Sequence, residues 1–396
     1  MTREEIANEL FATGKEIKQC FLNEMSSPEN TNTNSSSVYF QYIQLLNNLN
    51  ILYNALNTNY KDYNKQVTEL TDWNFTQQNS VQTFMSKFLS ILNGMLLNTI
   101  KFRKKYCLIR RNDMIPGFAS HIITNLGQIV KCLNDGYIPV IDTMNAKNIF
   151  TDLSKSHSTN AWELYFRQPF SLKYEDIIFT KDTKILEGIP AFMPNYNMDC
   201  LSNYELMTFW NSVMKKYMPF SNEFDTYLNQ CLENLPFETD AKILGVLCRG
   251  TDYTNIRPYN HPVQPSLNAI FTKTDEFMDK YQCDYCYLAT EDQEVLHAFQ
   301  DKFKDRLLTT QKIYYNTHLT DTINQTNMDS RIDIYHKNME YLAALALLSK
   351  CQYFVGGRTS GTVVVFLLSN KFKGNYIFDC GRYGIDDASS LTSYIL

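Results

Sequence analysis

Four polar segments of this 396-residue sequence follow short apolar runs and combine residue types that could bind an anion or move a proton. The first is Cys248-Arg249-Gly250-Thr251-Asp252. Arginine is permanently charged, and its planar guanidinium can hold two phosphate oxygens at once. Gly250 would allow close backbone approach, and Asp252 could fix the arginine or accept a hydroxyl proton. The alternative is an arginine–aspartate pair that only stabilises a loop, although neither residue is needed to end a strand.

The second segment is Gly356-Gly357-Arg358-Thr359-Ser360-Gly361-Thr362, between an apolar run and an apolar helical pattern. Backbone amides at a helix start, three hydroxyls and a cation favour phosphate binding. The segment lacks the lysine and Ser/Thr ending of a P-loop. A glycine-rich turn with a Ser/Thr cap is the alternative interpretation. The residues predicted to bind phosphate are Arg358, Thr359, Ser360, Gly361 and Thr362.

The third segment, Ala289-Thr290-Glu291-Asp292, places two carboxylates at a predicted helix start. They could simply complement the helix dipole, or Glu291 and Asp292 could face a ligand beside Arg249. The two interpretations have similar weight.

The fourth segment runs from Arg110 to Ser120, and its Asp113 is a candidate catalytic base or acceptor contact. Asp142, at the end of the next predicted strand, would lie nearby. Glu163 is a further candidate base and stands among three aromatic residues that could line a sugar site. A place in the core is the favoured interpretation for these aromatic residues, which are Trp162, Tyr165 and Phe166.

These segments need a scaffold that brings them together, and the hydrophobic patterns predict one. Strands are expected over 106–110, 137–142, 243–247, 285–289, 307–309, 353–355 and 376–379, alternating with helices. Ser266 and Thr290 are the expected caps of two of these helices. In parallel sheets ligands bind beyond the carboxyl ends of the strands, where all four segments would lie.

The first hundred residues follow a helical pattern, with a Thr2–Glu5 capping box and apolar stripes at helical spacing. A scaffold or an oligomerisation surface is the role expected for them. The predicted fold class is α/β, with two Rossmann-like domains facing a cleft and an N-terminal helical region. The predicted domain boundaries give the helical region over residues 1–100 and the two Rossmann-like domains over 101–238 and 239–396.

Composition excludes several classes of protein. A hydrophobic content of 44% is too high for a disordered chain, and a net charge of −5 gives no basic field for nucleic acid. The apolar runs are too short to span a membrane, and the N-terminus lacks the apolar core of a signal peptide, so a soluble, cytoplasmic protein is expected. The ten cysteines include one CxxC, Cys283 and Cys286, without the second pair that zinc needs, so reduced and mostly buried thiols are expected.

Three motifs resemble those of the GDP-fucose fucosyltransferase superfamily. Arg249–Asp252 is similar to its arginine motif, Ala289–Asp292 to its Thr-Asp-Asp element, and Phe354–Thr362 to its late Gly/Ser/Thr loop. Order and spacing agree over residues 240–384, and 106–142 fits more loosely. Two further residues of the α1,6 branch do not carry over: Leu247 replaces a histidine, and Ala344 replaces a base-reading aspartate, with Glu340 one turn away.

The resemblance implies a GT-B fold and an inverting, metal-independent transfer of fucose from GDP-fucose to a glycan hydroxyl. It also implies that residues 101–238 form the acceptor domain and that residues 239–396 form the nucleotide-sugar-binding domain. Arg249 would hold the donor phosphates, Thr359 to Gly361 the distal phosphate, and no cofactor or metal would be required. The acceptor would be a surface polysaccharide, with a lipid-linked form left open. The basic cluster 101–105 could then contact the inner membrane face, although a solvated helix end is the favoured interpretation of this cluster. Another donor, a nucleotide-sugar epimerase or hydrolase, and a non-catalytic binding protein are the alternatives.

Overall fold

The structure is a computed structural model. It describes residues 2–396 except 26–34, 57–62, 72, 74–77, 112–116, 146–148, 151–159, 178–182, 234, 239, 251–256, 311–313, 316–333, 370, 386–391 and 395–396. The chain forms two compact units. The first comprises Met1–Cys107, Lys131–Pro139 and Phe179–Lys184, and the second comprises Leu108–Val130, Val140–Ile178 and Ile185–Leu396.

The N-terminal region is helical, as predicted. Its helices are α1 (Arg3–Met25), α2 (Ser35–Leu56), α3 (Asn64–Thr71) and α4 (Gln78–Arg103). The capping box is confirmed: the backbone N–H of Glu5 donates to Thr2 Oγ1 at 3.2 Å, and that of Thr2 donates to Glu5 Oε2 at 2.7 Å. Apolar side chains from α1, α2 and α4 form a core of their own, including Leu10, Phe21, Leu46, Phe84 and Phe88.

A small sheet follows, with strand order β2-β1-β3. The predicted strand–helix–strand unit is confirmed as β1 (Tyr106–Arg110), α5 (Phe118–Asn134) and β2 (Ile138–Ile141), and β3 (Lys184–Glu187) is added to it. Gly136 ends α5 as predicted. Its φ of +77° suits glycine, and the Arg103 side chain lies where a Cβ atom would be.

The segment from 143 to 238 is irregular and then helical. It contains the short helices η2 (Ala161–Leu164), η3 (Pro169–Ser171), η4 (Tyr174–Asp176) and η5 (Pro236–Glu238), and the helices α6 (Met198–Ser202), α7 (Tyr204–Tyr217) and α8 (Asn222–Glu233). Trp162, Tyr165 and Phe166 are fully buried, so the prediction that they belong to the core is confirmed and they do not form an exposed aromatic wall.

A larger sheet has six strands in the order β6-β5-β4-β7-β8-β9. The first five, β4 (Ile243–Leu247), β5 (Tyr285–Ala289), β6 (Leu307–Leu308), β7 (Tyr353–Gly357) and β8 (Gly374–Asp379), pair in parallel, and β9 (Thr392–Tyr394) is antiparallel. The helices between them are α10 (Leu267–Tyr281), α11 (Gln293–Phe303), α12 (Ile334–Lys350) and α13 (Ser360–Leu368). The predicted α/β class with a parallel sheet is confirmed, and β9 was not predicted.

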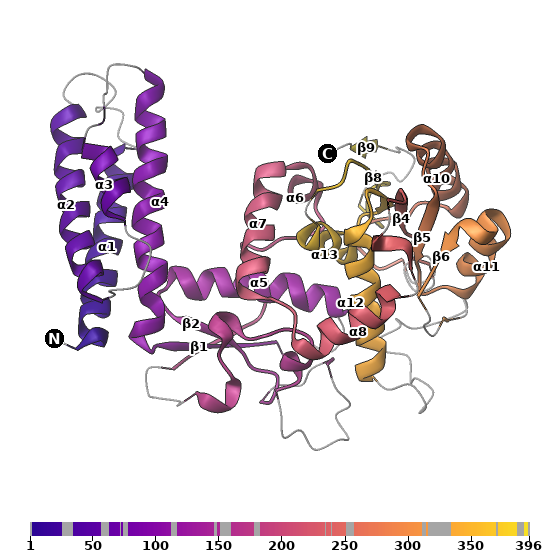
Figure 1. Ribbon diagram of the computed structural model, residues 1–396, viewed down its shortest axis with the longest axis horizontal. Coiled ribbons are helices and arrows are strands. Elements are labelled where there is room, and N and C mark those ends of the chain that lie inside the picture. Colours follow the sequence, from indigo (N-terminus) through magenta and orange to yellow (C-terminus); the bar gives the residue numbers. More distant parts are fainter. Residues whose placement is uncertain are drawn as a thin grey trace. The chain divides into compact units, whose positions relative to one another are not determined.

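Helices cover both faces of the larger sheet (Figure 1). On one face, Leu244 and Val246 of β4 pack with apolar residues of α10 and α11. On the other face, Gly245 leaves room for the end of α12, because a Cβ atom there would lie 2.9 Å from Leu348 Cδ2. Alternate residues of one strand therefore face two different helical layers.

The strand order places the point of reversal between β4 and β7. From β4 the chain moves to β5 and β6 on one side, and then crosses to β7 and β8 on the other. The crevice outside the carboxyl ends at such a switch point is the usual ligand site of doubly wound sheets. The segments that begin at Cys248 and at Arg358 follow these two strands directly.

Among the helices of the described ranges, none is long and apolar enough to cross a membrane. All ten cysteines are unbridged, and all but Cys20 and Cys231 are buried, as predicted.

Candidate functional site

The register of the larger sheet brings the predicted segments to one edge. Leu247, the last residue of β4, pairs with Ala289 of β5 on one side and with Gly356 of β7 on the other. The residues that follow these strands therefore start side by side. Arg249, Glu291 and the N-terminus of α13 therefore follow adjacent strand ends at the carboxyl edge.

Arg249 is half-buried directly beyond β4. The guanidinium charge of Arg249 acts on His261. Burial lowers the pKa of the His261 imidazole, and the nearby guanidinium lowers this pKa further. The loop that carries His261 is fixed to the C-terminal part of the chain, because the N–H of Tyr383 donates to the His261 carbonyl at 2.9 Å and that of Val263 to the Gly381 carbonyl at 2.9 Å. Sequence reasoning missed His261, since no local pattern predicts that it lies near Arg249.

Gly250 and the two carboxylates form a compact group. The N–H of Gly250 donates to Glu291 Oε1 at 3.1 Å, so Glu291 holds the backbone beside Arg249. Asp292 is 1% exposed, and its Oδ1 accepts from the N–H groups of Glu294 at 2.8 Å and Val295 at 3.1 Å. A Cβ atom at Gly250 would lie 2.4 Å from Asp292 Oδ2, so the close approach that glycine permits here is to Asp292.

These bonds correct one prediction. Asp292, and not Thr290, is the N-cap of α11. The hydroxyl of Thr290 instead accepts from the N–H of Asp292 at 3.2 Å and so helps to orient the true cap. Aspartate is a preferred N-cap residue because its carboxylate satisfies first-turn amides and complements the helix dipole.

The N-terminus of α13 is capped by Thr359. Its hydroxyl accepts from the N–H of Thr362 at 3.1 Å, and the Thr362 hydroxyl donates to the Gly357 carbonyl at 2.5 Å. Two of the three predicted hydroxyls therefore hold the loop itself, and Ser360 is the half-buried third. The amides of Ser360 and Gly361 belong to the first turn, whose N–H groups have no carbonyl partner within a helix and attract anions.

Arg358 is 5% exposed and points to the neighbouring strand end, where its Nη1 forms an ion pair with Asp379 Oδ1 at 2.5 Å. Its carbonyl accepts from Gln264 Nε2 at 3.2 Å. Within the described residues its Nε and Nη2 atoms are buried and have no hydrogen-bond partner. Arg249 is thus the more accessible guanidinium at this edge.

Glu340 is on α12, and its charge acts on Tyr315. Burial raises the pKa of Tyr315 to about 12, with smaller contributions from the charges of Glu340 and Glu291. The N–H of Tyr315 donates to the Glu291 carbonyl at 2.8 Å, which fixes this tyrosine beside the β5 end. Ala344 is 2% exposed, so the position matched to a base-reading aspartate is buried and carries no polar group.

The predicted polar residues of the first sheet are engaged in local structure. Arg110 Nε pairs with Asp142 Oδ2 at 2.7 Å, and Asp142 Oδ1 also accepts from the N–H of Met144 at 3.1 Å and of Asn145 at 3.2 Å. Arg111 is buried and donates to the Thr124 hydroxyl at 2.6 Å. Asp142 therefore anchors the end of β2.

Of the three predicted catalytic bases, only Glu163 lies within the described residues. Asp113 and Asp252 lie outside the described residues. Glu163 is half-buried on η2, and its Oε1 accepts from the N–H of Tyr174 at 3.0 Å. Burial raises the pKa of Glu163, with the neighbouring charge of Glu175 acting in the same direction.

An aromatic contact connects the start of α5 with α12, which packs against α13. Phe118, the first residue of α5, packs edge-on against Tyr341 of α12, with ring centroids 6.4 Å apart, and against Tyr165 at 5.0 Å. The Tyr341 hydroxyl is 3.0 Å from where a Cβ atom of Gly361 would lie. The N-terminus of α5, where the Arg110–Ser120 segment ends, is therefore near the N-terminus of α13 within the second unit.

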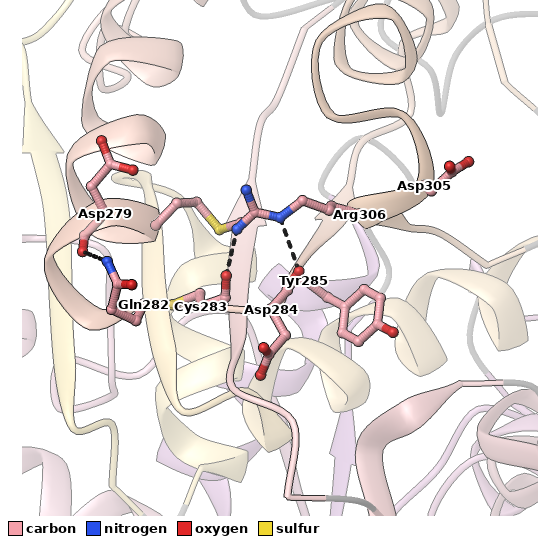
Figure 2. Close-up of a pocket in the computed structure, with 8 residues that line it drawn as sticks. Asp279, Gln282, Cys283, Asp284, Tyr285, Asp305 and Arg306 are labelled. Atoms are coloured by element: carbon pink, nitrogen blue, oxygen red, sulfur yellow. Dashed lines mark hydrogen bonds between the residues drawn. The ribbon is translucent and has the colours of Figure 1, made fainter.

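A separate pocket lies at the opposite edge of the larger sheet (Figure 2). It opens at the amino ends of β5 and β6 and is lined by residues that include Asp279, Asp284 and Arg306. Arg306 donates to the carbonyls of Cys283 at 2.5 Å and Asp284 at 3.1 Å, as Figure 2 shows. The guanidinium of Arg306 is thus already hydrogen-bonded to backbone carbonyls. The pocket is distinct from the site at the carboxyl edge. No cluster of histidine, cysteine and acidic residues suited to a metal ion occurs in the described part of the chain.

No family model matches the sequence, and no curated protein matches it by sequence. Among solved structures, the chain is similar to the fucosyltransferase NodZ from Bradyrhizobium, with 12% identity and a TM-score of 0.41 over 73% of this chain and 98% of that one. It is similar to a mutant of Arabidopsis thaliana FUT1 in complex with GDP, with 10% identity and a TM-score of 0.41 over 69% of this chain and 70% of that one. POFUT1 in complex with GDP gives 10% identity and a TM-score of 0.40 over 67% and 95%.

Proposed function

We propose that this protein is an inverting, metal-independent glycosyltransferase that moves fucose from GDP-fucose to a hydroxyl of a glycan. The observation that carries the proposal is the group at the switch point of the larger sheet. A half-buried arginine follows β4, and a capped helix N-terminus follows β7, the adjacent strand. A diphosphate placed between them would meet a fixed cation and free amides.

These groups suit the leaving group of the reaction. As the bond between sugar and diphosphate breaks, negative charge grows on the phosphate oxygens. Arg249 and the first-turn amides of α13 would stabilise that charge without a metal ion, because they are already oriented toward it. Thr359 supports this role indirectly, since its capping bond to the Thr362 N–H holds the helix start in place.

Arg358 would add a second contact. A buried guanidinium with unmet donors is unfavourable, and a phosphate oxygen reaching Nε or Nη2 would offset that cost. Asp379 would act as a positioning residue, because its ion pair fixes the orientation of Arg358.

The base of the donor would be read by carboxylates. Guanine offers two adjacent N–H donors, and an ionised carboxylate accepts two hydrogen bonds side by side. We assign this role to Glu340. Its charge and that of Glu291 both act on Tyr315. Replacement of Glu340 by Gln should weaken GDP binding more than UDP binding.

The acceptor hydroxyl must lose a proton as it attacks the anomeric carbon from the face opposite the diphosphate. Asp252, Asp113 and Glu163 remain the proposed bases. The contact from Phe118 to Tyr341 supports an acceptor-side role for the Arg110–Ser120 segment, since it brings α5 near α13. The acceptor that we propose is a surface polysaccharide or its lipid-linked precursor, met on the cytoplasmic side. Lys101, Lys104 and Lys105 of the basic cluster 101–105 would lie near the lipid, whereas Arg103 is buried and donates to the Gly136 carbonyl.

The decisive assay follows donor turnover in EDTA. Purified protein is incubated with GDP-fucose, with and without a mixture of glycan acceptors, and free GDP and labelled glycan are measured. Acceptor-dependent GDP release with labelled glycan supports the proposal. GDP release into water alone indicates a hydrolase, isomerised donor indicates an epimerase, and binding without turnover of any nucleotide sugar indicates a non-catalytic relative.

A further inference from the structure

Helix α2 is long, partly exposed and without a charged residue. Its 22 residues contain no Asp, Glu, Lys, Arg or His, whereas 20% of the whole sequence is charged. One side of the helix is buried in the N-terminal unit through residues such as Ile43, Leu46, Leu49 and Tyr53. The other side is exposed, and by helical spacing it carries Phe40, Gln44, Asn47 and Ile51, which we call the α2 face.

The α2 face exposes large apolar side chains. Phe40 is 51% exposed and Ile51 is 67% exposed, while Leu45, on another side of the helix, is 40% exposed. Single exposed apolar residues are ordinary, whereas apolar side chains gathered on one uncharged face can form a contact surface. By contrast, the exposed positions of α1 include Glu4, Glu9, Lys15 and Glu16.

We propose that the α2 face binds the α2 face of a second copy of this chain, with the two helices antiparallel about a two-fold axis. In such a contact, the numbers of any two residues that face each other across the axis add up to the same total. With the axis midway between residues 45 and 46, Phe40 meets Ile51 of the second copy, and Gln44 meets Asn47. Apolar groups then pack on apolar groups and amides on amides, so the face is complementary to itself.

Chemistry favours a second copy over other occupants. An amide side chain has both donors and acceptors, so it can pair with another amide across the axis. A charged face would repel an identical face, and this face carries no charge. Phe40 and Ile51 are eleven residues apart, about 16 Å along the helix, so the contact is shorter than a standard interface. The dimer is therefore expected to be weak, with a dissociation constant on the order of micromolar.

Sedimentation velocity on the full chain between about 1 and 100 µM tests the proposal. The wild type should move with concentration from 46.2 kDa toward twice that mass. Phe40→Glu and Ile51→Lys should each stay monomeric, because each places a charge against an apolar side chain. An equimolar mixture of the two variants should dimerise again, since Glu at 40 then faces Lys at 51 of the other copy while the remaining Phe40 and Ile51 still pack.

Glu16→Lys is the matched control, an exposed charge change on α1, and it should dimerise like the wild type. Circular dichroism melts would show that all variants are folded, as expected for exposed positions. A wild type that stays monomeric at 100 µM overturns the proposal. So does a dimer that both single variants retain, a mixture that fails to recover, or binding of wild type to uncharged phosphatidylcholine vesicles in place of self-association.

Discussion

Replacement of Arg249 by alanine should weaken nucleotide binding without unfolding the second unit. A charge-assisted hydrogen bond contributes about 1.5–3 kcal/mol, so the dissociation constant for GDP should rise about 10- to 150-fold. The structural cost should be small. Arg249 is only half-buried and lies beyond the last residue of β4, and the bond from the Cys248 N–H to the Ala289 carbonyl, at 3.1 Å, does not involve its side chain.

Isothermal calorimetry with GDP in EDTA measures this effect, with urea unfolding as the parallel readout. Arg306→Ala is the matched control, because it removes an arginine from the opposite edge of the same sheet. Arg306 bonds only to carbonyls there in the described structure, so its loss should lower stability and leave GDP affinity unchanged. The reasoning fails if Arg249→Ala binds GDP as tightly as the wild type, or if both variants lose affinity equally.

Three further outcomes are expected. Asp142→Ala should destabilise the protein by about 3–5 kcal/mol in urea unfolding, because it leaves Arg110 without its buried anion; a loss under about 1 kcal/mol would show that the pair is not structural. Asp292→Ala should lower the free energy of unfolding by about 0.5–2 kcal/mol, because the α11 cap is lost. Asp292→Asn should lower it much less, since the side-chain oxygen of asparagine still accepts the capping bonds. Equal losses for the two variants would contradict the capping role. The pKa of His261 lies below its usual value, so Arg249→Ala should raise it, and bound GDP should raise it in the wild type; an imidazole NMR titration unchanged by either would place the anion elsewhere.

The order of elements in the larger sheet could be predicted because its determinants are local. Each strand is a short apolar run between polar segments, and Ser266 caps α10 as expected, with its hydroxyl accepting from the Ala269 N–H at 3.3 Å. Adjacency of the polar segments then followed from the parallel topology. The extra strand β9 was missed because its pairing with β8 depends on a return of the C-terminal segment that no pattern near it indicates.

Side-chain partners could not be predicted in the same way. Arg358 follows β7 as expected, but its ion pair with Asp379 comes from the end of β8, twenty-one residues later. Asp292 and Thr290 are both good caps, and only the backbone geometry decides between them. His261 approaches Arg249 because a long loop is fixed to the C-terminal part of the chain, which is tertiary information.

The central claim is that a nucleotide diphosphate lies at the carboxyl edge of β4 and β7. The most direct measurement is a crystal structure of the full chain with GDP-fucose or GDP, grown without divalent metal. The account predicts diphosphate density between Arg249 and the first-turn amides of Ser360 and Gly361. Nucleotide density in the pocket beside Arg306, at the amino edge, or a nucleotide that leaves the α13 N-terminus without a phosphate contact, would contradict it.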